Sequence, residues 1–297
     1  MTDEVLAVLR EAGRVAAAAR DMGARLIIAG AALREVCEAV EDEIRRRGGA
    51  LAFPAQTSRN QIAAHYCPSP EDGTLYEEGD LAKLDIGVHI DGWVVDTAVT
   101  VNVGGQAAPQ RLVDAARAAL EAAIDTAGPG VPIPRVSAAI EATLRSHGVR
   151  PMKNLCGHHV GRWTVHAPPP VPNIADDGTE RLAVGAVLAI EPFATEGLGF
   201  VLEQGRPEVF RLPTGPEDGA GMDAEVLAAI VAKQGLPFSR RDLRAFPEPR
   251  VEETLATLVA RGRLASYAPL VEASGRPVAQ AEHTLHVGRN GVEVLTR

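Results

Sequence analysis

The chain has 297 residues, of which 46% are hydrophobic and 23% are charged, and its formal net charge is −9. This length and apolar content are sufficient for a large buried core and exclude an intrinsically disordered chain. The acidic balance, without a basic block, argues against a nucleic-acid backbone or an anionic membrane surface as the main partner. It favours a neutral or cationic small ligand.

The cysteines and the N-terminus indicate the compartment. Cys37, Cys67 and Cys156 are too few for a disulfide framework and form no C-x-x-C pair, which is typical of a reducing environment. The opening "MTDEVLAVLREAGR" is charged within its first turns, unlike a signal peptide, and no apolar run reaches the roughly 18 residues that cross a membrane. We therefore expect a soluble, cytoplasmic protein.

The first segment predicts two helices. In the second, "LREVCEAVEDEIRRRGG", apolar residues recur at helical spacing, and Gly48 and Gly49 end the pattern, so Cys37 is expected to be a core residue. Two more helices are expected near 108–127 and 135–147. Because a strand-rich region follows each helical pair, the order of elements resembles a duplicated α/β half.

Residues 208–267 contain successive helical patterns with caps and glycine stops, which predict a helical insert subdomain. Residues 1–207 and 268–297 would then form the main domain. Asp223 is expected to cap a helix at its N-terminus, and Gly235 is expected to end one. An alternative is a helix-turn-helix that contacts nucleic acid through Arg240, Arg241 and Arg244. The insert lacks the sustained basic stripe that this alternative requires.

The stretch "KLDIGVHIDGWVVDTAVTV", residues 83–101, predicts a β-hairpin that carries two carboxylates. A two-residue turn at Asp91-Gly92 would pair Gly87 with Asp96 and place Asp85 opposite Ala98. The two aspartates would then be diagonal neighbours about 7 to 8 Å apart at the backbone, with Gly87 leaving a space between the strands.

Two like charges in an apolar hairpin need a positive partner. At a separation near 4 Å they repel by roughly 4 kcal/mol at an effective dielectric constant of 20. Lys83, an arginine from elsewhere in the fold, or a divalent metal ion could supply the charge, and the hairpin alone leaves these alternatives open.

Other polar residues in strand-like segments favour the metal. Glu191 ends the apolar run "VGAVLAI", and Glu282 lies within "PVAQAEHTLHV"; buried glutamates are rare without partners. His158 in "NLCGHHVGRWTVH" adds an imidazole. Four carboxylates and one imidazole suit a pair of divalent ions, whereas a structural zinc site lacks its thiolate ligands.

Five stretches resemble the successive motifs of type 2 methionine aminopeptidases, and together they cover nearly the whole chain. They are "FPAQTSRNQIAAHYCP", "KLDIGVHIDGWVVDTAVTV", "NLCGHHVGRWTVHAPPPVPNI", "IEPFATEGLGFVLEQGRPEVFRL" and "SYAPLVEASGRPVAQAEHTLHV". The short N-terminus is similar to the archaeal form. The resemblance implies the pita-bread fold, an α+β architecture of two pseudo-symmetric halves around a dimetal centre, here with a helical insert.

The resemblance also implies the site residues. Two divalent ions (Co, Mn, Fe or Zn) would be held by Asp85, Asp96, His158, Glu191 and Glu282. Glu191, His65 and His166 would be catalytic, and the substrate would contact His65, His166, Phe53, Phe193 and Tyr267. His159, His283 and His286 are expected to be structural. Four positions depart from the family pattern and leave the substrate preference open: Gln61, Cys67, Trp163 and Pro168.

The implied reaction is removal of the initiator methionine from nascent proteins and peptides, by metal-activated hydroxide that attacks the scissile carbonyl, with Glu191 taking the proton. We expect a monomer without a membrane or specific nucleic-acid partner, and the ribosome is a further candidate partner. Proline-directed peptidases share the fold and ligands but lack the insert. A binding protein that has lost its chemistry would have lost ligands, and all five are present here.

Overall fold

The computed structural model describes residues 1–215 and 219–297 of the chain. The helices within these residues are α1 (Asp3–Leu26), α2 (Leu33–Arg46), α3 (Ala107–Thr126), α4 (Ile133–Ser146), α5 (Ala224–Val231), the 3-10 helix η1 (Arg240–Leu243) and α6 (Glu248–Ala260). Both expected helical pairs are present. None of the helices in the described ranges is long and apolar enough to span a membrane.

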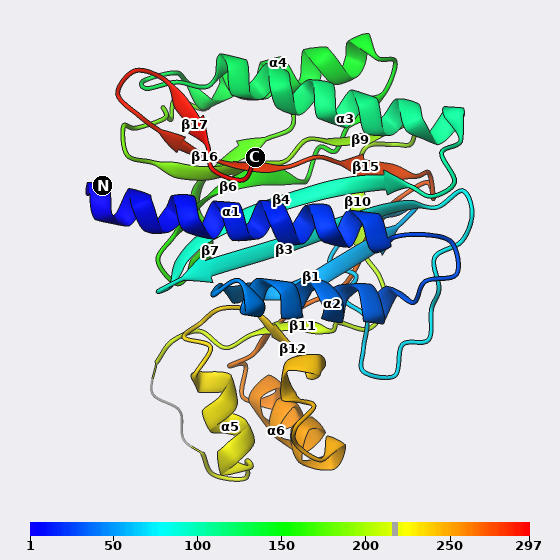
Figure 1. The fold of residues 1–297 in the computed structure, drawn as a ribbon, viewed down its shortest axis with the longest axis vertical. Coiled ribbons are helices and arrows are strands. Elements are labelled where there is room, and N and C mark those ends of the chain that lie inside the picture. Colours follow the sequence, from blue (N-terminus) through cyan, green and yellow to red (C-terminus); the bar gives the residue numbers. More distant parts are fainter. Residues whose placement is uncertain (216–218) are drawn as a thin grey trace.

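The two helical pairs are laid out alike, which supports the expected duplication. Helices α2 and α4 have the same length of 14 residues. The backbone N–H of Gly30 donates to Tyr76 before α2, and that of Gly130 donates to Leu182 before α4. In Figure 1 the first pair (blue) crosses the front of the strands, and the second pair (green) lies above them. The α+β class and the two pseudo-symmetric halves are thus confirmed.

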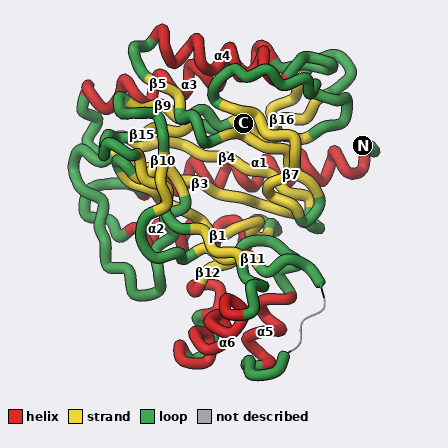
Figure 2. The backbone as a smooth tube through the Cα atoms, turned by 180° about the vertical axis from the view of Figure 1, so that it is seen from behind, coloured by secondary structure: helices red, strands yellow, loops and turns green. Residues whose placement is uncertain are grey.

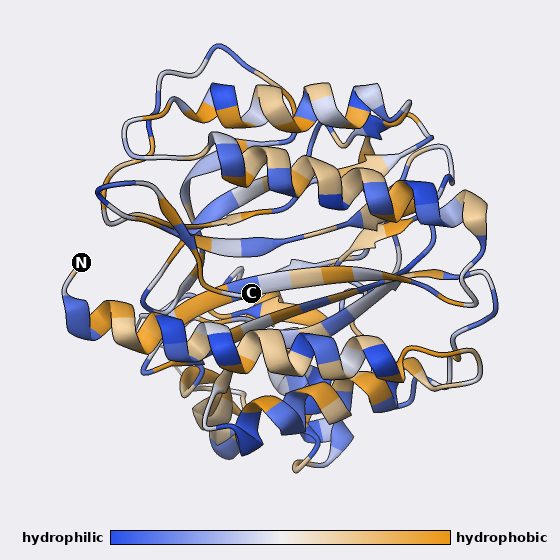
Figure 3. Cartoon of the chain, turned by 45° about the horizontal axis from the view of Figure 1, so that its top comes forward, coloured by the Kyte–Doolittle hydropathy of each residue, from blue (hydrophilic) through white to orange (hydrophobic). Residues whose placement is uncertain are grey.

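Helix α2 shows why these segments become helical. Its apolar residues recur every three to four positions and are buried, including Cys37, which is fully buried as expected. Gly48 follows the helix with a φ of 85°, a left-handed conformation that glycine adopts readily. Figure 3 shows hydrophobic and hydrophilic residues alternating along the helices, as is typical of helices that cover a sheet on one side.

The main sheets are antiparallel and belong to different halves. The first, in the order β1-β3-β4, consists of β1 (Ala50–Arg59), β3 (Leu81–Ile90) and β4 (Trp93–Asn102). The second, in the order β17-β16-β8-β6-β7, consists of β6 (Cys156–Gly161), β7 (Thr164–Pro172), β8 (Val187–Ile190), β16 (His283–Val287) and β17 (Val292–Val294). Figure 2, seen from behind, shows the strands in front of α1.

Two smaller sheets accompany the main ones. One, in the order β15-β9-β5, consists of β5 (Arg150–Pro151), β9 (Phe193–Thr195) and β15 (Val278–Gln280). The other, in the order β10-β14-β2, consists of β2 (Ile62–Ala64), β10 (Val201–Glu203) and β14 (Leu270–Glu272). Hydroxyl groups of β4 connect it to the end of β15 and to the residues that follow: Thr100 Oγ1 donates to the carbonyl of Gln280 at 2.7 Å, and Thr97 Oγ1 donates to that of Glu282 at 2.9 Å.

The region 208–267 has a hydrophobic cluster of its own, whose buried members all lie between Phe210 and Leu264. Asp223 caps α5 by accepting from two backbone N–H groups, as expected. Besides its helices the region contains a small sheet in the order β12-β11-β13, formed by β11 (Val209–Arg211), β12 (Phe238–Ser239) and β13 (Ala265–Tyr267). The sequence patterns had indicated only helices there, because such short strands leave no periodic signal.

Candidate metal centre and substrate cavity

The β3-β4 hairpin has the register expected from its turn. Asp91 and Gly92 both have positive φ, 51° and 85°, as a two-residue hairpin turn requires. Gly87 is paired with Asp96, and Asp85 is opposite Ala98. Because side chains alternate along a strand, both carboxylates project from one face of the hairpin.

Gly87 has a different role from the one expected. The neighbouring strand β1 places Phe53 opposite Gly87. A Cβ added at residue 87 would lie 3.0 Å from the Cβ of Ala52 and closer still to two ring carbons of Phe53. The space above Gly87 is therefore filled by an aromatic ring that strand pairing alone could not reveal, and it is not left open between the aspartates.

The two glutamates lie at breaks between strands. Glu191 follows β8 and precedes Pro192 and β9, while Glu282 lies between β15 and β16. At Glu191 the chain passes from β8, which pairs with β16 in the five-stranded sheet, to β9 in the β15-β9-β5 sheet. At Glu282 it passes back from β15, which pairs with β9, to β16. A side chain at such a switch can point into the seam between the sheets, and both glutamates line one cavity there.

The β6-β7 hairpin brings two histidines together. The chain turns at Arg162 and Trp163, directly after the predicted turn at Gly161, and the rings of His158 and His166 lie 4.4 Å apart between centroids. His158 Nδ1 donates to the carbonyl of His159 at 3.2 Å, which leaves Nε2 as the acceptor.

Side chains from three distant segments converge on this imidazole. Ligand-type atoms of Asp96, His158 and Glu282 all lie within 4.8 Å of one another, and all three residues are buried. His158 Nε2 is 3.5 Å from Asp96 Oδ2 and 3.7 Å from Glu191 Oε1. Asp85 lines the same cavity. The structure thus brings together all five residues that the sequence singled out as ligands.

The electrostatics of this cluster fit a bound cation. Burial raises the pKa of Asp85 to about 7, and burial together with the neighbouring carboxylates raises the pKa values of Asp96, Glu191 and Glu282 well above the usual range. Burial, with a smaller effect of His166, lowers the pKa of His158 to about 3, so its imidazole is neutral at pH 7, the form that binds metals.

The alternative charge partners are engaged elsewhere. Lys83 Nζ donates to the carbonyls of Asn60 at 2.9 Å and Leu81 at 3.3 Å. Within residues 1–215 and 219–297, no lysine or arginine forms an ion pair with the four carboxylates. Asp85 Oδ1 and Asp96 Oδ1 are buried without a hydrogen-bond partner there. Orphaned carboxylate oxygens and one neutral imidazole form a donor set suited to divalent metal ions.

Gln280 is a site residue that the sequence reasoning missed. Its Nε2 lies 3.4 Å from Asp85 Oδ2, 3.2 Å from Glu191 Oε2 and 3.4 Å from Glu282 Oε2. The side chain is 1% exposed, so its amide is an uncharged donor shared among three carboxylates. A signal existed in the sequence, because Gln280 precedes Glu282 by two positions in a strand-like run, where alternate residues share a face.

A cavity of about 420 Å³ opens above the carboxylates and has an apolar wall. Phe53, Phe193 and Tyr267 all line it, together with His65 and His166. The rings of His65 and Tyr267 meet edge to face, with centroids 5.9 Å apart. The structure therefore brings the expected substrate residues to the same cavity as the carboxylates.

His65 is held in an unusual conformation next to this wall. Its φ is 66°, in the left-handed region that few residues other than glycine adopt. Burial is the main reason why the pKa of His65 falls to about 4, with a smaller contribution from His166. The ring is consequently neutral at pH 7.

The other residues that the sequence singled out are the additional histidines, the four departures from the family pattern and the arginines of region 208–267. His159 Nδ1 donates to the carbonyl of Pro169 at 2.7 Å, and His283 Nδ1 lies 2.9 Å from Thr296 Oγ1. Of the four departures, Pro168 lines the cavity, Trp163 packs on Gly92, and Cys67 is buried, whereas Gln61 is exposed. The arginines considered for nucleic-acid contact are paired with carboxylates: Arg240 with Glu208 and Glu252, Arg241 with Glu41, and Arg244 with Glu38.

Comparison with known proteins identifies relatives along the full length of the chain. A methionine aminopeptidase from Thermococcus kodakarensis is 42% identical over 292 residues, which are 97% of this chain and 98% of that protein. A methionine aminopeptidase from Archaeoglobus fulgidus is 39% identical over 298 residues and is matched end to end.

Solved structures share the fold at lower identity. A methionine aminopeptidase from Thermotoga maritima superposes with a TM-score of 0.74 at 23% identity, covering 100% of this chain and 98% of the other. A prolidase from Pyrococcus furiosus has a TM-score of 0.65 at 17% identity, covering 100% and 64%. These similarities confirm the pita-bread fold. Together with the sequence model of metallopeptidase family M24, which matches residues 7–229, they show that the chain belongs to metallopeptidase family M24.

Proposed function

We propose that this protein is a methionyl aminopeptidase that removes the N-terminal methionine from peptides and nascent proteins. The observation that carries the proposal is one cavity in which a buried cluster of carboxylates and imidazole adjoins an aromatic wall. The full-length relatives that are named methionine aminopeptidase support the same reading.

In this proposal Asp85, Asp96, His158, Glu191 and Glu282 hold two divalent ions, with cobalt, manganese, iron and zinc as candidates. Such ions, when bound, supply Lewis-acid chemistry: they lower the pKa of a coordinated water and polarise a carbonyl. Gln280 contributes by holding the carboxylates in place with an uncharged donor, so that it adds no charge to the cluster.

Glu191 is the proposed proton acceptor for the attacking water. Its side chain is 13% exposed, whereas Asp96 and Glu282 are more deeply buried, so Glu191 can be reached from the cavity. Burial, with a smaller effect of the Asp85 carboxylate, raises the pKa of the Glu191 side chain above the usual range.

His65 and His166 are proposed to hold the peptide group on the opposite side of the cavity. The His65 ring donates to the backbone carbonyl of Ala268, which favours a neutral tautomer whose other nitrogen accepts a hydrogen bond. We therefore assign His65 to the substrate amide N–H. His166, which is more exposed, remains able to donate to the carbonyl oxygen as negative charge develops there.

The aromatic wall is proposed to select the methionine side chain. Phe53 and Phe193 are 6% and 1% exposed, so their rings are held by packing, while Tyr267 is less buried and approaches His65. A thioether packs favourably against aromatic edges, and its flexible chain adapts to an apolar pocket.

The proposal extends to organisation and setting. We assign 1–207 with 268–297 to the catalytic domain and 208–267 to the insert, which the separate hydrophobic cluster of the insert supports. A cytoplasmic location fits the three free cysteines. A monomeric state and an association with the ribosome are part of the same proposal.

The decisive assay supplies cobalt, manganese, iron or zinc in turn to chelator-treated protein and measures hydrolysis of Met-Ala-Ser and of an Xaa-Pro peptide. We expect metal-dependent release of methionine and little cleavage of the proline peptide. Preference for the proline peptide would instead assign the protein to the proline-directed enzymes of the same fold.

A Glu191→Gln variant tests the assigned base. We expect turnover to fall by about 10² to 10⁴-fold with the fold retained, the range typical of a lost general base. Glu196→Gln is the matched control, because Glu196 is five positions away and pairs with Arg111 at 3.5 Å outside the cavity. Near-normal turnover of the Glu191 variant would remove the assigned role.

A further inference from the structure

Arg241 is a buried arginine that reaches from the insert into the catalytic domain. It lies in η1 and is 4% exposed. Its Nη2 donates to Glu41 Oε1 of α2 at 2.5 Å and to the carbonyl of Ala55 in β1 at 3.2 Å. Its Nη1 donates to the carbonyl of Pro68 at 2.5 Å and lies 3.3 Å from Cys67 Sγ. One guanidinium therefore contacts three separate segments.

The contact at Ala55 coincides with an irregularity of β1. Phe53 is paired with Gly87 and Gln56 with Asp85, so β1 has one more residue than β3 between these pairs. Such a bulge leaves backbone groups without ladder partners and re-aims the side chains beside it. Here the Ala55 N–H donates to Glu41 Oε1 at 3.0 Å, and its carbonyl accepts from Arg241.

The residues that flank this bulge line the substrate cavity. Phe53 belongs to the apolar wall, and Gln56 lines the cavity opposite Asp85. Because buried backbone groups require partners, the Glu41–Arg241 pair stabilises the bulged path of the chain. That path determines where the Phe53 ring points.

The other end of the guanidinium holds the segment after His65. Residues 65–68 run from the left-handed His65 to Pro68, whose carbonyl accepts from Arg241. The carbonyl of Tyr66 accepts from the N–H of Thr57 at 2.9 Å, two residues beyond the bulge. The segment that carries His65 and the strand that carries Phe53 are thus connected to one side chain.

We propose that Arg241, together with Glu41, is a positioning pair that sets the Phe53 and His65 walls of the substrate cavity from the insert. This inference rests on the proposed aminopeptidase function. The insert then has a role in substrate selection beyond the cavity-lining residues Val209, Pro237 and Tyr267 that it contributes directly.

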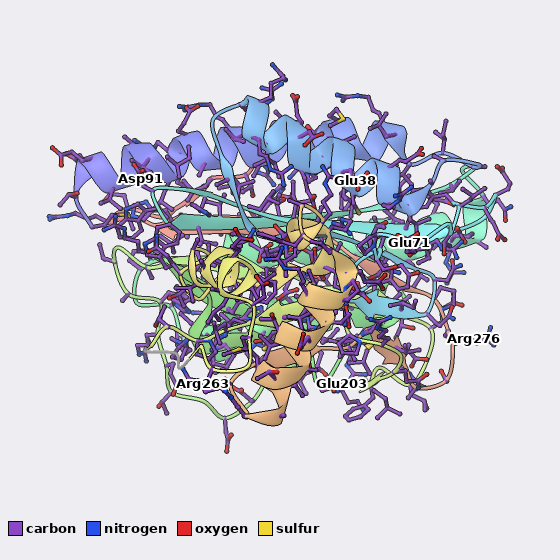
Figure 4. All side chains as sticks on the ribbon, turned by 90° about the horizontal axis from the view of Figure 1, so that it is seen from below. Glu38, Glu71, Asp91, Glu203, Arg263 and Arg276 are labelled. Atoms are coloured by element: carbon purple, nitrogen blue, oxygen red, sulfur yellow. The ribbon has the colours of Figure 1, made fainter. Side chains whose placement is uncertain are left out.

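A purely stabilising role explains the pair less well. Buried ion pairs contribute little net stability, because the cost of desolvating both charges offsets their attraction. The insert is also connected to α2 by an ion pair in which Arg244 Nη1 lies 2.9 Å from Glu38 Oε1. Glu38 is labelled in Figure 4. That pair is more exposed and satisfies no backbone group of the cavity wall.

The test compares two variants with a control from the same turn. Arg241→Lys keeps the charge but loses the fork that joins Glu41, Ala55 and Pro68. Glu41→Gln combined with Arg241→Met removes both charges, so no uncompensated charge stays buried. Arg240→Met is the control, since Arg240 contacts Glu208 at 3.1 Å and Glu252 at 2.5 Å, both inside the insert.

The readout is the ratio of kcat/KM for Met-Ala-Ser to that for Leu-Ala-Ser, measured on metal-loaded full-length protein. A variant that is only less folded loses the same fraction of activity on both peptides, so the ratio does not change. We expect both Arg241 variants to lose about tenfold in kcat/KM for Met-Ala-Ser, equivalent to 1.4 kcal/mol, mainly through KM. We expect the ratio of kcat/KM for Met-Ala-Ser to that for Leu-Ala-Ser to fall at least about threefold in both Arg241 variants. The Arg240→Met control should keep the wild-type ratio. The affinity for divalent ions should be unchanged in all three proteins.

An unchanged ratio in both Arg241 variants overturns the positioning role. An equal fall in the Arg240→Met control overturns it as well, because the effect would then follow from any loosening of the insert. If the double variant does not fold, Arg241→Lys decides by the same ratio. Failure of the proposed function is a separate result, because wild-type protein would then cleave neither peptide.

Discussion

Replacing Gly87 with alanine tests whether the hairpin that carries the aspartates also sets the aromatic wall. In the structure an added Cβ would lie 3.0 Å from Ala52 Cβ and closer still to the Phe53 ring. Carbon atoms in contact normally lie about 3.5 to 4.0 Å apart, so the ring has to move by roughly 1 Å or rotate out of its position.

The cost of that movement follows from the packing around the ring. Phe53 is 6% exposed and belongs to the main hydrophobic cluster, so it cannot turn to solvent. Overpacking of this kind costs about 1 to 3 kcal/mol of unfolding free energy. With each kcal/mol worth roughly 2 °C in a chain of this size, we expect Tm to fall by about 4 °C. The displaced ring would also narrow the cavity and raise KM for a methionyl peptide.

The assay combines thermal unfolding with steady-state kinetics on Met-Ala-Ser. Gly73→Ala is the control, because a Cβ there meets nothing within 4 Å. A Phe53→Leu background removes the ring, so Gly87→Ala should then destabilise the protein less than it does in wild type. Equal destabilisation in both backgrounds, or a Gly87→Ala protein that behaves like Gly73→Ala, would refute the reasoning.

Two further predictions concern residues around the proposed metal centre. The pKa of His65 is about 4 in the folded chain and about 6.5 when unfolded, so the folded state binds fewer protons between these values. The contribution of His65 to stability should therefore be complete above about pH 6.5 and be lost as pH decreases towards 4. His65→Asn, which tolerates the left-handed φ, should remove on the order of 2 kcal/mol of this loss in urea unfolding curves, relative to wild type. Parallel pH curves for both proteins would contradict this assignment. Gln280→Ala should weaken binding of the divalent ion by about 10 to 100-fold in calorimetry, because a group that orients metal ligands has that effect, whereas unchanged affinity would make Gln280 a packing residue.

The part of the site that lies in the β3-β4 hairpin could be predicted from the sequence. The register of the β3-β4 hairpin depends on the φ values available to Asp91 and Gly92 and on the alternation of side chains along strands. Both are properties of neighbouring residues, so the shared face of Asp85 and Asp96 followed without knowledge of the fold. The helices were equally predictable, since burial on one side imposes a regular spacing of apolar residues.

The assignments of His65, His166 and the aromatic wall depended on resemblance to a family, because nothing in the residues around them indicates a cavity. His65 illustrates the limit. A histidine between "AA" and "YCP" has no local signal, and only its contacts with Tyr267 and its place beside His166 make it part of a site.

The sequence by itself thus determined the elements, the hairpin register and the residue types that suit a metal. Tertiary structure alone decided what surrounds them: the Phe53 ring fills the space above Gly87, Gln280 lies among three carboxylates, and Arg241 satisfies a bulge in a strand far from it in the chain. The physical reason is that φ and ψ preferences and periodicity act over a few residues. Contacts between distant segments depend on how the sheets and residues 208–267 pack against one another, and short-range sequence patterns do not determine that packing.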